Sequence, residues 1–123
     1  MGPVSVVLVS DATAPHAARA FLRAQAPDQA LGGHAPTAAL LVRGLVTNAV
    51  RYGRGDTVRL VVDLRERRLL VSVSDSNPVA PQLAEREQEQ GGRGLALVDA
   101  LASGWGTREA GGGKTVWFAL DLR

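Results

Sequence analysis

Hydrophobic positions along the chain follow two spacings, and each spacing predicts a different kind of element. Valine- and leucine-rich runs that alternate loosely with polar residues are typical of strands, whereas apolar residues repeating about every three to four positions are typical of helices. Strands are predicted at residues 4–10, 57–64, 69–75, 105–109 and 115–122. Helices are predicted from a cap at Asp11 or Thr13 to about Gln25, from Pro36 to Tyr52, and over residues 95–101.

The order of these elements predicts the fold class. A strand is followed by two helices, a hairpin, a loop, one helix and a final hairpin, without an internal repeat or a domain boundary. This order indicates a single domain over residues 1–123 with an α+β fold, a two-layer α/β sandwich whose mixed, mostly antiparallel sheet carries helices on one face. Residues 28–35 are expected to form a loop. The inner side of the first helix is expected to carry Ala17, Ala20, Phe21 and Ala24.

A long polar segment separates the first hairpin from the last helix. Residues 76–92 contain two prolines, few apolar side chains and the acids Glu85, Glu87 and Glu89. Loops of this length in a compact domain are usually either functional or disordered. The segment is therefore a candidate part of a functional site.

Composition excludes several classes of function but says little about the fold. The chain has 46% hydrophobic and 21% charged residues and no cysteine, so disulfides and thiolate metal sites are excluded. It has no apolar run near the roughly 20 residues of a membrane span and no charged start of a secretion signal, so a cytoplasmic protein without membrane contact is expected. Its net charge is only +2, its arginines are scattered and aromatic residues are few, so direct nucleic-acid binding is not expected.

One amide lies in the middle of an otherwise apolar helical segment. Asn48 is surrounded by Leu45, Val46, Ala49 and Val50. A buried amide without partners costs about 1–3 kcal/mol, so this position needs a partner. That partner is either a neighbouring backbone carbonyl or a bound ligand, such as a metal ion or a phosphate.

Two later segments carry groups that complement such an amide. The strand at residues 69–75 ends in Asp75, which is either a turn residue or an acceptor for an exocyclic amine such as that of adenine. Gly92 and Gly94 start the next helix, where they are either caps or a means of bringing backbone N–H groups close to phosphate oxygens. An amide, a carboxylate and a glycine-rich helix start, in this order around a polar loop, together favour a nucleotide site.

This combination resembles the GHKL ATP-binding superfamily, which is named for gyrase, the heat-shock chaperone, histidine kinases and mismatch-repair proteins and has the Bergerat fold. Within it, the chain is most similar to small bacterial ATP-binding regulators akin to anti-sigma-factor serine kinases. The resemblance covers nearly the whole chain. It is carried by residues 45–51 (LVTNAVR) at the family's N box, residues 92–101 (GRGLALVDAL) with Trp105-Gly106 at its second glycine box, and residues 113–117 (GKTVW) at its closing strand.

The resemblance implies ATP and Mg²⁺ as cofactors and assigns roles to several residues. Asn48 would ligate the Mg²⁺ that bridges the nucleotide phosphates. Asp75 would accept a hydrogen bond from the adenine amine, and Thr115 would help through a water. Arg51, one turn from the metal position, either faces phosphate or is an exposed arginine.

By the same resemblance, the phosphates would lie at the start of the last helix. The residues placed there are Gly92, Arg93, Gly94 and Leu95, under a lid formed by about residues 76–92. The family's first glycine box is reduced in this chain, because residues 75–79 (DSNPV) keep the aspartate and lack the glycines. Adenine recognition tolerates this change better than the geometry of the lid does. Tyr52 also stands where a histidine is common in the family.

A further departure from the family concerns catalysis. Family kinases carry a glutamate four residues before the N-box asparagine, on the same face of the helix, where it activates the attacking group. This chain has Gly44 at that position, and its neighbour Arg43 is cationic. Loss of a positioned base lowers a rate by about 10²–10⁴. ATP binding is therefore expected to persist and phosphotransfer to be impaired, and no catalytic residue is assigned.

These features favour an ATP-binding regulatory protein that changes between partner-bound states. The implied partners are a sigma factor or an anti-sigma-factor antagonist, besides ATP and ADP, and a homodimer also agrees with the resemblance. Two alternatives stay open. One is an active serine/threonine kinase in which Glu85, Glu87 or Glu89 replaces the missing base, since phosphoryl transfer depends largely on positioning. The other is an interaction module that has lost nucleotide binding.

Overall fold

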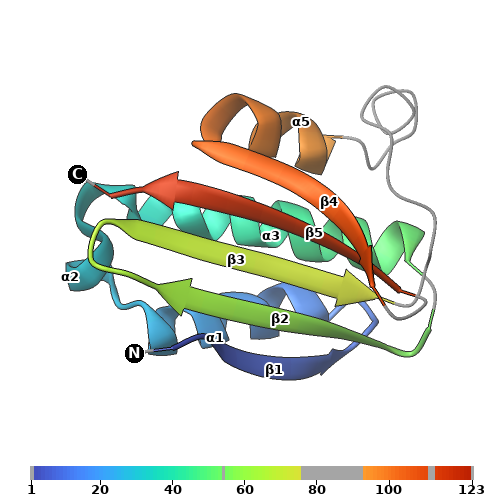
Figure 1. The fold of residues 1–123 in the computed structure, drawn as a ribbon. Helices are drawn as coiled ribbons and strands as arrows, with labels where there is room; N and C mark the ends of the chain where they lie inside the picture. Colours follow the sequence, from blue (N-terminus) through green and yellow to red (C-terminus); the bar gives the residue numbers. More distant parts are fainter. Residues whose placement is uncertain (1, 54, 76–92, 111–112, 123) are drawn as a thin grey trace.

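The computed structural model describes residues 2–53, 55–75, 93–110 and 113–122 (Figure 1). Its strands are β1 (Val4–Val9), β2 (Thr57–Leu64), β3 (Arg68–Asp75), β4 (Gly104–Ala110) and β5 (Gly113–Asp121). Its helices are α1 (Ala14–Gln25), α2 (Asp28–Leu31), α3 (Ala35–Tyr52) and α5 (Arg93–Leu101), with a 3₁₀ turn η1 at Gly32–His34. All predicted strands and helices are present, with ends that differ by a few residues, and the predicted loop at residues 76–92 lies outside the described part.

The five strands form one sheet in the order β1-β2-β3-β5-β4. Each of these pairings is antiparallel, so the sheet that was expected to be mixed is antiparallel throughout its described strands. The last hairpin explains the difference. Its second strand, β5, returns beside β3 in the opposite direction, and β4, which runs parallel to β3, becomes the outer strand.

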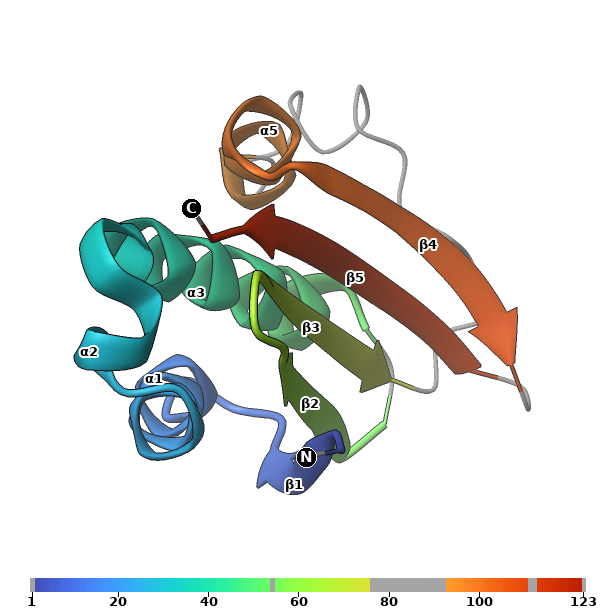
Figure 2. The ribbon, with the colours of Figure 1, turned by 60° about the vertical axis from the view of Figure 1, so that its left-hand side comes forward.

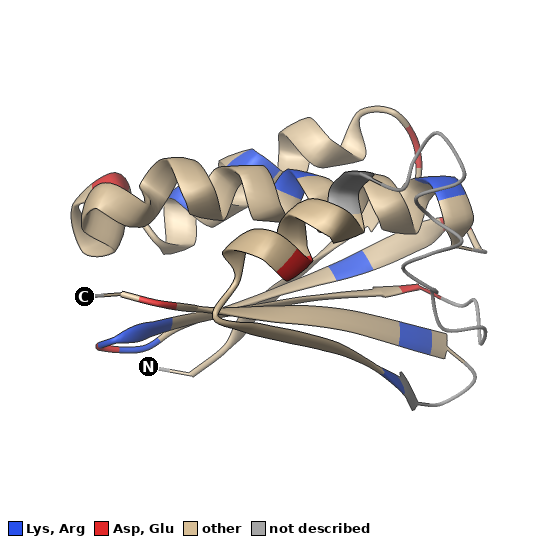
Figure 3. Cartoon of the chain, turned by 90° about the horizontal axis from the view of Figure 1, so that it is seen from above, with Lys and Arg blue, Asp and Glu red and all other residues tan. Residues whose placement is uncertain are grey.

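Helices α1, α3 and α5 cover one face of the sheet, and no described helix covers the other (Figures 2 and 3). Side chains alternate between the two faces of a strand. On β2, Val58, Leu60 and Val62 are buried toward the helices, whereas Thr57 and Arg59 are exposed. The predicted two-layer sandwich is thus confirmed. None of the helices in the described ranges has the length and hydropathy needed to cross a membrane.

Two local predictions are wrong. Residues 28–35 were expected to form a loop, but α2 and η1 occupy them, because Leu31 buries its side chain and holds this short helical turn against the core. The buried residues of α1 are Ala14, Ala18 and Leu22, about one position away from the predicted inner face. An alanine-rich helix offers several equivalent apolar stripes, so its periodicity does not select one of them.

Candidate functional site

The end of β3 meets the end of α3 on the helix-covered face of the sheet. Helix α3 ends at Tyr52, and the N–H of Gly53 donates to the carbonyl oxygen of Ala49 over 2.8 Å. A Cβ at position 53 would lie 2.6 Å from Oδ2 of Asp75 and would also collide with the carbonyl oxygen of Ala49. Only a residue without a side chain permits this approach. The carboxylate therefore lies against the last turn of α3, close to the turn that carries Asn48.

Lys114 lies directly opposite Asp75. The two are partners in the antiparallel register of β3 and β5, so their side chains project from the same face of the sheet. Nζ of Lys114 is 3.5 Å from Oδ2 of Asp75, and the two side chains are 1% and 3% exposed. The carboxylate also lies near the C-terminal end of α3, which is the negative end of the helix dipole. The buried ammonium offsets both negative groups.

Asn48 is the one polar residue in the buried set of α3. That set consists of Ala38, Leu41, Val42, Leu45, Val46, Asn48 and Ala49. Asn48 is 1% exposed, and neither its Oδ1 nor its Nδ2 has a hydrogen-bond partner among the described residues. A backbone carbonyl therefore does not satisfy the amide in this part of the chain. Its oxygen suits Mg²⁺, a hard cation that takes oxygen ligands from protein and phosphate.

Thr115 projects from the other face of the sheet. Its hydroxyl lies 2.7 Å from the hydroxyl of Ser74, its register partner. Thr115 follows Lys114 in the sequence, and Ser74 precedes Asp75. Successive side chains of a strand point to opposite faces. The structure therefore does not bring Thr115 to Asp75 as predicted, and the position that faces Asp75 is held by Lys114.

The predicted phosphate-binding residues lie at the start of α5. This helix begins at Arg93, includes Gly94 in its first turn and packs against α3. Leu95 is fully buried, so its side chain belongs to the core, and a ligand can meet only its backbone. Gly92 lies outside the described residues. The start of a helix offers N–H groups and the positive end of the dipole to an anion.

Arg51 and Gly44 occupy two further positions on α3. Arg51 is exposed, and its guanidinium carbon lies 5.9 Å from the centre of the Tyr52 ring. Gly44 lies within the helix, one turn before Asn48, so the helix presents no side chain at the position of the family's glutamate. The predicted acids Glu85, Glu87 and Glu89 lie outside the described ranges.

Sequence reasoning missed Lys114, although a signal for it exists. Lys114, Val116 and Phe118 alternate along β5 and are 1%, 3% and 0% exposed. A lysine that continues a buried alternation needs an anionic partner. It is also the sole lysine of the chain. Pairing this position with the carboxylate at the end of the neighbouring strand requires the strand order, which the sequence pattern does not supply.

The antiparallel sheet with helices on one face, the buried amide of its central helix and the buried carboxylate at a strand end define a GHKL-type domain with the Bergerat fold. The family model for the histidine kinase-like ATPase domain matches residues 7–120, so the chain belongs to this family. The resemblance seen in the sequence is confirmed at this level. Among curated proteins, no sequence matches the chain significantly.

Solved structures share this fold. The RsbU and RsbW domains of Rv1364c from Mycobacterium tuberculosis align with a TM-score of 0.72 and 23% identity, over 99% of this chain and 32% of that one. Histidine kinase AdeS from Acinetobacter baumannii aligns with a TM-score of 0.55 and 12% identity, over 97% of this chain and 68% of that one. The histidine kinase domain of the Erythrobacter litoralis EL346 blue-light activated histidine kinase aligns with a TM-score of 0.56 and 20% identity, over 88% of this chain and 59% of that one. The present chain thus spans about a third of the mycobacterial chain.

Proposed function

We propose that this chain is an ATP-binding regulatory domain of the anti-sigma-factor kinase-like type, which acts through protein partners. The observation that carries the proposal is Asn48, a buried amide whose polar atoms form no hydrogen bond with the described residues. An unsatisfied amide of this kind costs about 1–3 kcal/mol, and a ligand at the site accounts for its presence in the core. The family, that of histidine kinase-like ATPase domains, supports Mg²⁺ and the phosphates of ATP as that ligand.

In this proposal, each part of the site contacts a different part of the nucleotide. Asn48 would ligate Mg²⁺, which would neutralise phosphate charge. The start of α5, at Arg93 and Gly94, directs backbone N–H groups toward the phosphates. Asp75 accepts a hydrogen bond from the amino group of adenine. The close approach of Gly53 supports this assignment, because it fixes the carboxylate against the helix that carries Asn48.

The proposed role is regulation, with phosphotransfer impaired. Gly44 offers no side chain one turn before Asn48, where a general base would face the metal. We expect Gly44→Glu to raise transfer of labelled phosphate from ATP to a candidate antagonist protein by about 10²–10⁴. Gly44→Gln, which has nearly the same shape and is not a base, is the matched control. Equal transfer by both variants and the natural chain would show that another group already performs this role.

The proposed partners are a sigma factor or an anti-sigma-factor antagonist, and a homodimer is the proposed assembly. The likeness to a chain that contains an RsbW domain supports this assignment at the level of the fold. ATP and ADP would alter partner binding only by their different affinities for two conformations. Pull-down of purified candidate partners with ATP, ADP or neither tests whether the partner complex depends on the nucleotide.

A second candidate is the interaction module without nucleotide. One observation favours it: Asp75 already has a buried cation, Lys114, at 3.5 Å. An ion pair inside the chain supplies what an adenine amine would otherwise supply to the carboxylate. Under this candidate, Asp75 and Lys114 only stabilise the junction of β3, β5 and α3.

Calorimetric titration with ATP, with and without Mg²⁺, separates the two candidates. We expect binding that requires Mg²⁺ and weakens by about tenfold or more in Asp75→Asn, because a charged acceptor is lost. Asp63→Asn is the control: Asp63 lies on the open face, and its hydrogen bond raises the pKa of the exposed Arg65 guanidinium. This control is expected to bind ATP as the natural chain does. Absence of binding heat at millimolar ATP would contradict the proposal and favour the interaction module.

A further inference from the structure

The buried pair of Asp75 and Lys114 places an acceptor and a donor side by side where the base is proposed to bind. A carboxylate only accepts hydrogen bonds and an ammonium only donates them. We propose that Lys114 is a specificity-determining residue, which donates to N1 of adenine while Asp75 accepts from the 6-amino group. This inference rests on the proposed ATP-binding function. It assigns recognition of the base to a residue for which the family resemblance gives no role.

The geometry supports joint recognition by the two side chains. They are register partners on the helix-covered face, with Nζ of Lys114 3.5 Å from Oδ2 of Asp75, which is close enough for one base edge to meet both. Gly53 lets the end of α3 approach the carboxylate, so this group is held between the helix and the lysine. Selective recognition of a base requires groups held in fixed positions, because a mobile donor can hydrogen-bond to other bases as well as to adenine.

The chemistry of the pair matches adenine in particular. Along its 6-amino and N1 edge, adenine presents a donor next to an acceptor, which complements a carboxylate next to an ammonium. Guanine and hypoxanthine present the reverse order, a carbonyl oxygen next to an N–H. With the base in the same orientation, the carbonyl oxygen would face the carboxylate of Asp75 and the N–H would face the ammonium of Lys114, so both contacts would be repulsive.

The ion pair and the base contacts are compatible with each other. A carboxylate has about four lone-pair sites on its two oxygens, and an ammonium has three donors, so their mutual contact does not exhaust either group. Both side chains are almost fully buried, at 3% and 1% exposed. In such a low-dielectric environment a hydrogen bond to a charged group is stronger than in water, and its loss is correspondingly large. The hydrogen-bonding capacity of the two groups therefore allows the ion pair to persist when the base binds.

Calorimetry with a matched pair of nucleotides tests the inference. 1-Deaza-ATP keeps the 6-amino group of ATP and replaces N1 by carbon, so it removes only the proposed acceptor for Lys114. We expect the natural chain to bind it about 10- to 100-fold more weakly than ATP. In Lys114→Met the two nucleotides are expected to bind equally, whereas Lys114→Arg, which keeps a cationic donor, is expected to preserve a difference.

The test includes a control variant on the open face of the sheet and a replacement variant in case Lys114→Met does not fold. Arg108→Met removes an exposed cation from the open face of the neighbouring strand β4 and is expected to leave the ratio of the two affinities unchanged. Thermal unfolding verifies that each variant is folded. Should Lys114→Met fail to fold, Lys114→Leu replaces it: its side chain has no donor, so it is also expected to lose the discrimination.

The outcomes distinguish this inference from the function on which it rests. Equal binding of ATP and 1-deaza-ATP by the natural chain would overturn the role of Lys114 and leave ATP binding intact. An unchanged ratio in Lys114→Met would assign N1 to another group and would also overturn it. Tighter ATP binding by Lys114→Met would show that the lysine competes with the base. Failure of the natural chain to bind either nucleotide would overturn the proposed function, and the inference with it.

Discussion

The two faces of the sheet differ most at two neighbouring positions of the same strands. On the helix-covered face, Asp75 and Lys114 form a buried ion pair between β3 and β5. On the open face, Ser74 and Thr115 join the same two strands by neutral hydroxyls 2.7 Å apart. The backbone register is shared, so the difference comes from what covers each face. Helices remove water from one pair of positions, and a charge there must be matched by a partner or a ligand.

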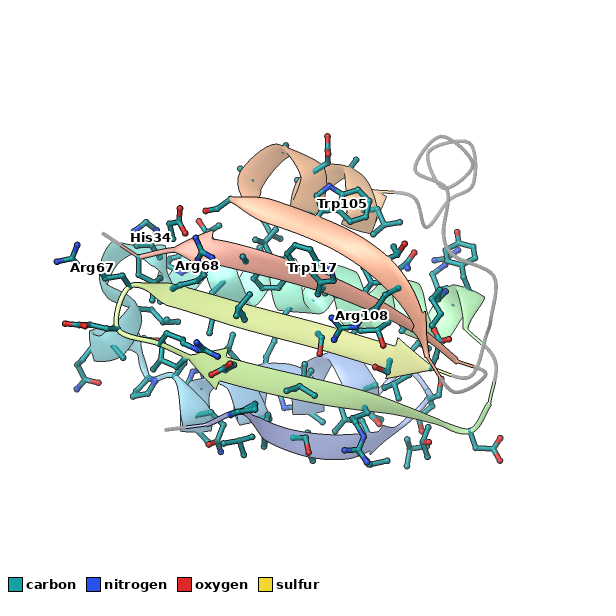
Figure 4. All side chains as sticks on the ribbon, viewed as in Figure 1. His34, Arg67, Arg68, Trp105, Arg108 and Trp117 are labelled. Carbon is teal, nitrogen blue, oxygen red and sulfur yellow. The ribbon has the colours of Figure 1, made fainter. Side chains whose placement is uncertain are left out.

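The open face combines exposed and buried side chains: Arg108 is exposed, whereas Thr115 is only 8% exposed. Trp117 and Arg108 project from it in the view of Figure 4. A Cβ on Gly106 would lie 3.0 Å from the indole nitrogen of Trp117, so this ring lies across β4. A hollow of about 330 Å³ on this face is lined by Trp117, Arg108 and Val61 among others, and it includes none of the residues that the sequence assigned to a nucleotide. The proposed site and this hollow thus lie on opposite sides of one sheet.

The strongest test of this comparison is to remove one charge of the buried pair. Lys114→Met leaves the Asp75 carboxylate buried without its ammonium, and loss of one partner of a buried pair costs about 3–5 kcal/mol. Denaturant-induced unfolding measures the change. The double variant Asp75→Asn/Lys114→Met is expected to lose less than Lys114→Met alone, because no uncompensated charge stays in the core. An equal loss in both would show that the carboxylate is not the partner that matters.

A somewhat smaller effect is expected from adding a methyl group at the junction. In Gly53→Ala the new Cβ meets the Ala49 carbonyl and Asp75 Oδ2, and such overpacking costs about 1–3 kcal/mol in unfolding free energy. Gly33→Ala is the matched control, because a Cβ at that position has no heavy atom within 4 Å. Similar melting temperatures for the two variants would contradict the close approach of α3 to the carboxylate.

Replacing the buried amide is expected to change stability in the opposite direction. Asn48→Leu removes two polar atoms without partners among the described residues, so the unfolding free energy in the absence of nucleotide should rise by about 1–2 kcal/mol. The same change should abolish Mg²⁺-dependent ATP binding. Thr47→Val, at the neighbouring half-buried position, should alter neither quantity much. A loss of stability in Asn48→Leu would show that the amide has a structural partner.

The smallest effect is expected on the open face. Thr115→Val removes the hydroxyl that faces Ser74 and keeps the shape of the side chain, so about 1 kcal/mol of stability should be lost. Nucleotide affinity should be unchanged, because Thr115 and Asp75 project from opposite faces. A clear loss of ATP affinity in this variant would restore the role that the resemblance gave to Thr115.

The sequence indicated those candidate site residues that depend on local pattern. Asn48 was recognisable because one amide interrupts an apolar helical segment, and Asp75 because it follows a valine-rich strand. The assignment of Thr115 did not fit, because neighbouring residues of a strand differ in the face they occupy and the family motif does not give that face. The contact between Lys114 and Asp75 depends on β5 lying beside β3, a long-range property. For the same reason the sequence could not show that the sheet is antiparallel throughout.

Because Lys114 is the sole lysine of the chain and is almost fully buried, its amine can serve as a chemical reporter. An acylating reagent that modifies lysine has one ε-amine to reach, and that amine lies at the proposed adenine position. The extent of labelling at this residue, read by mass spectrometry of its peptide, would therefore measure how often the buried ion pair is exposed to water. Protection by added ATP would then be measurable without any engineered label.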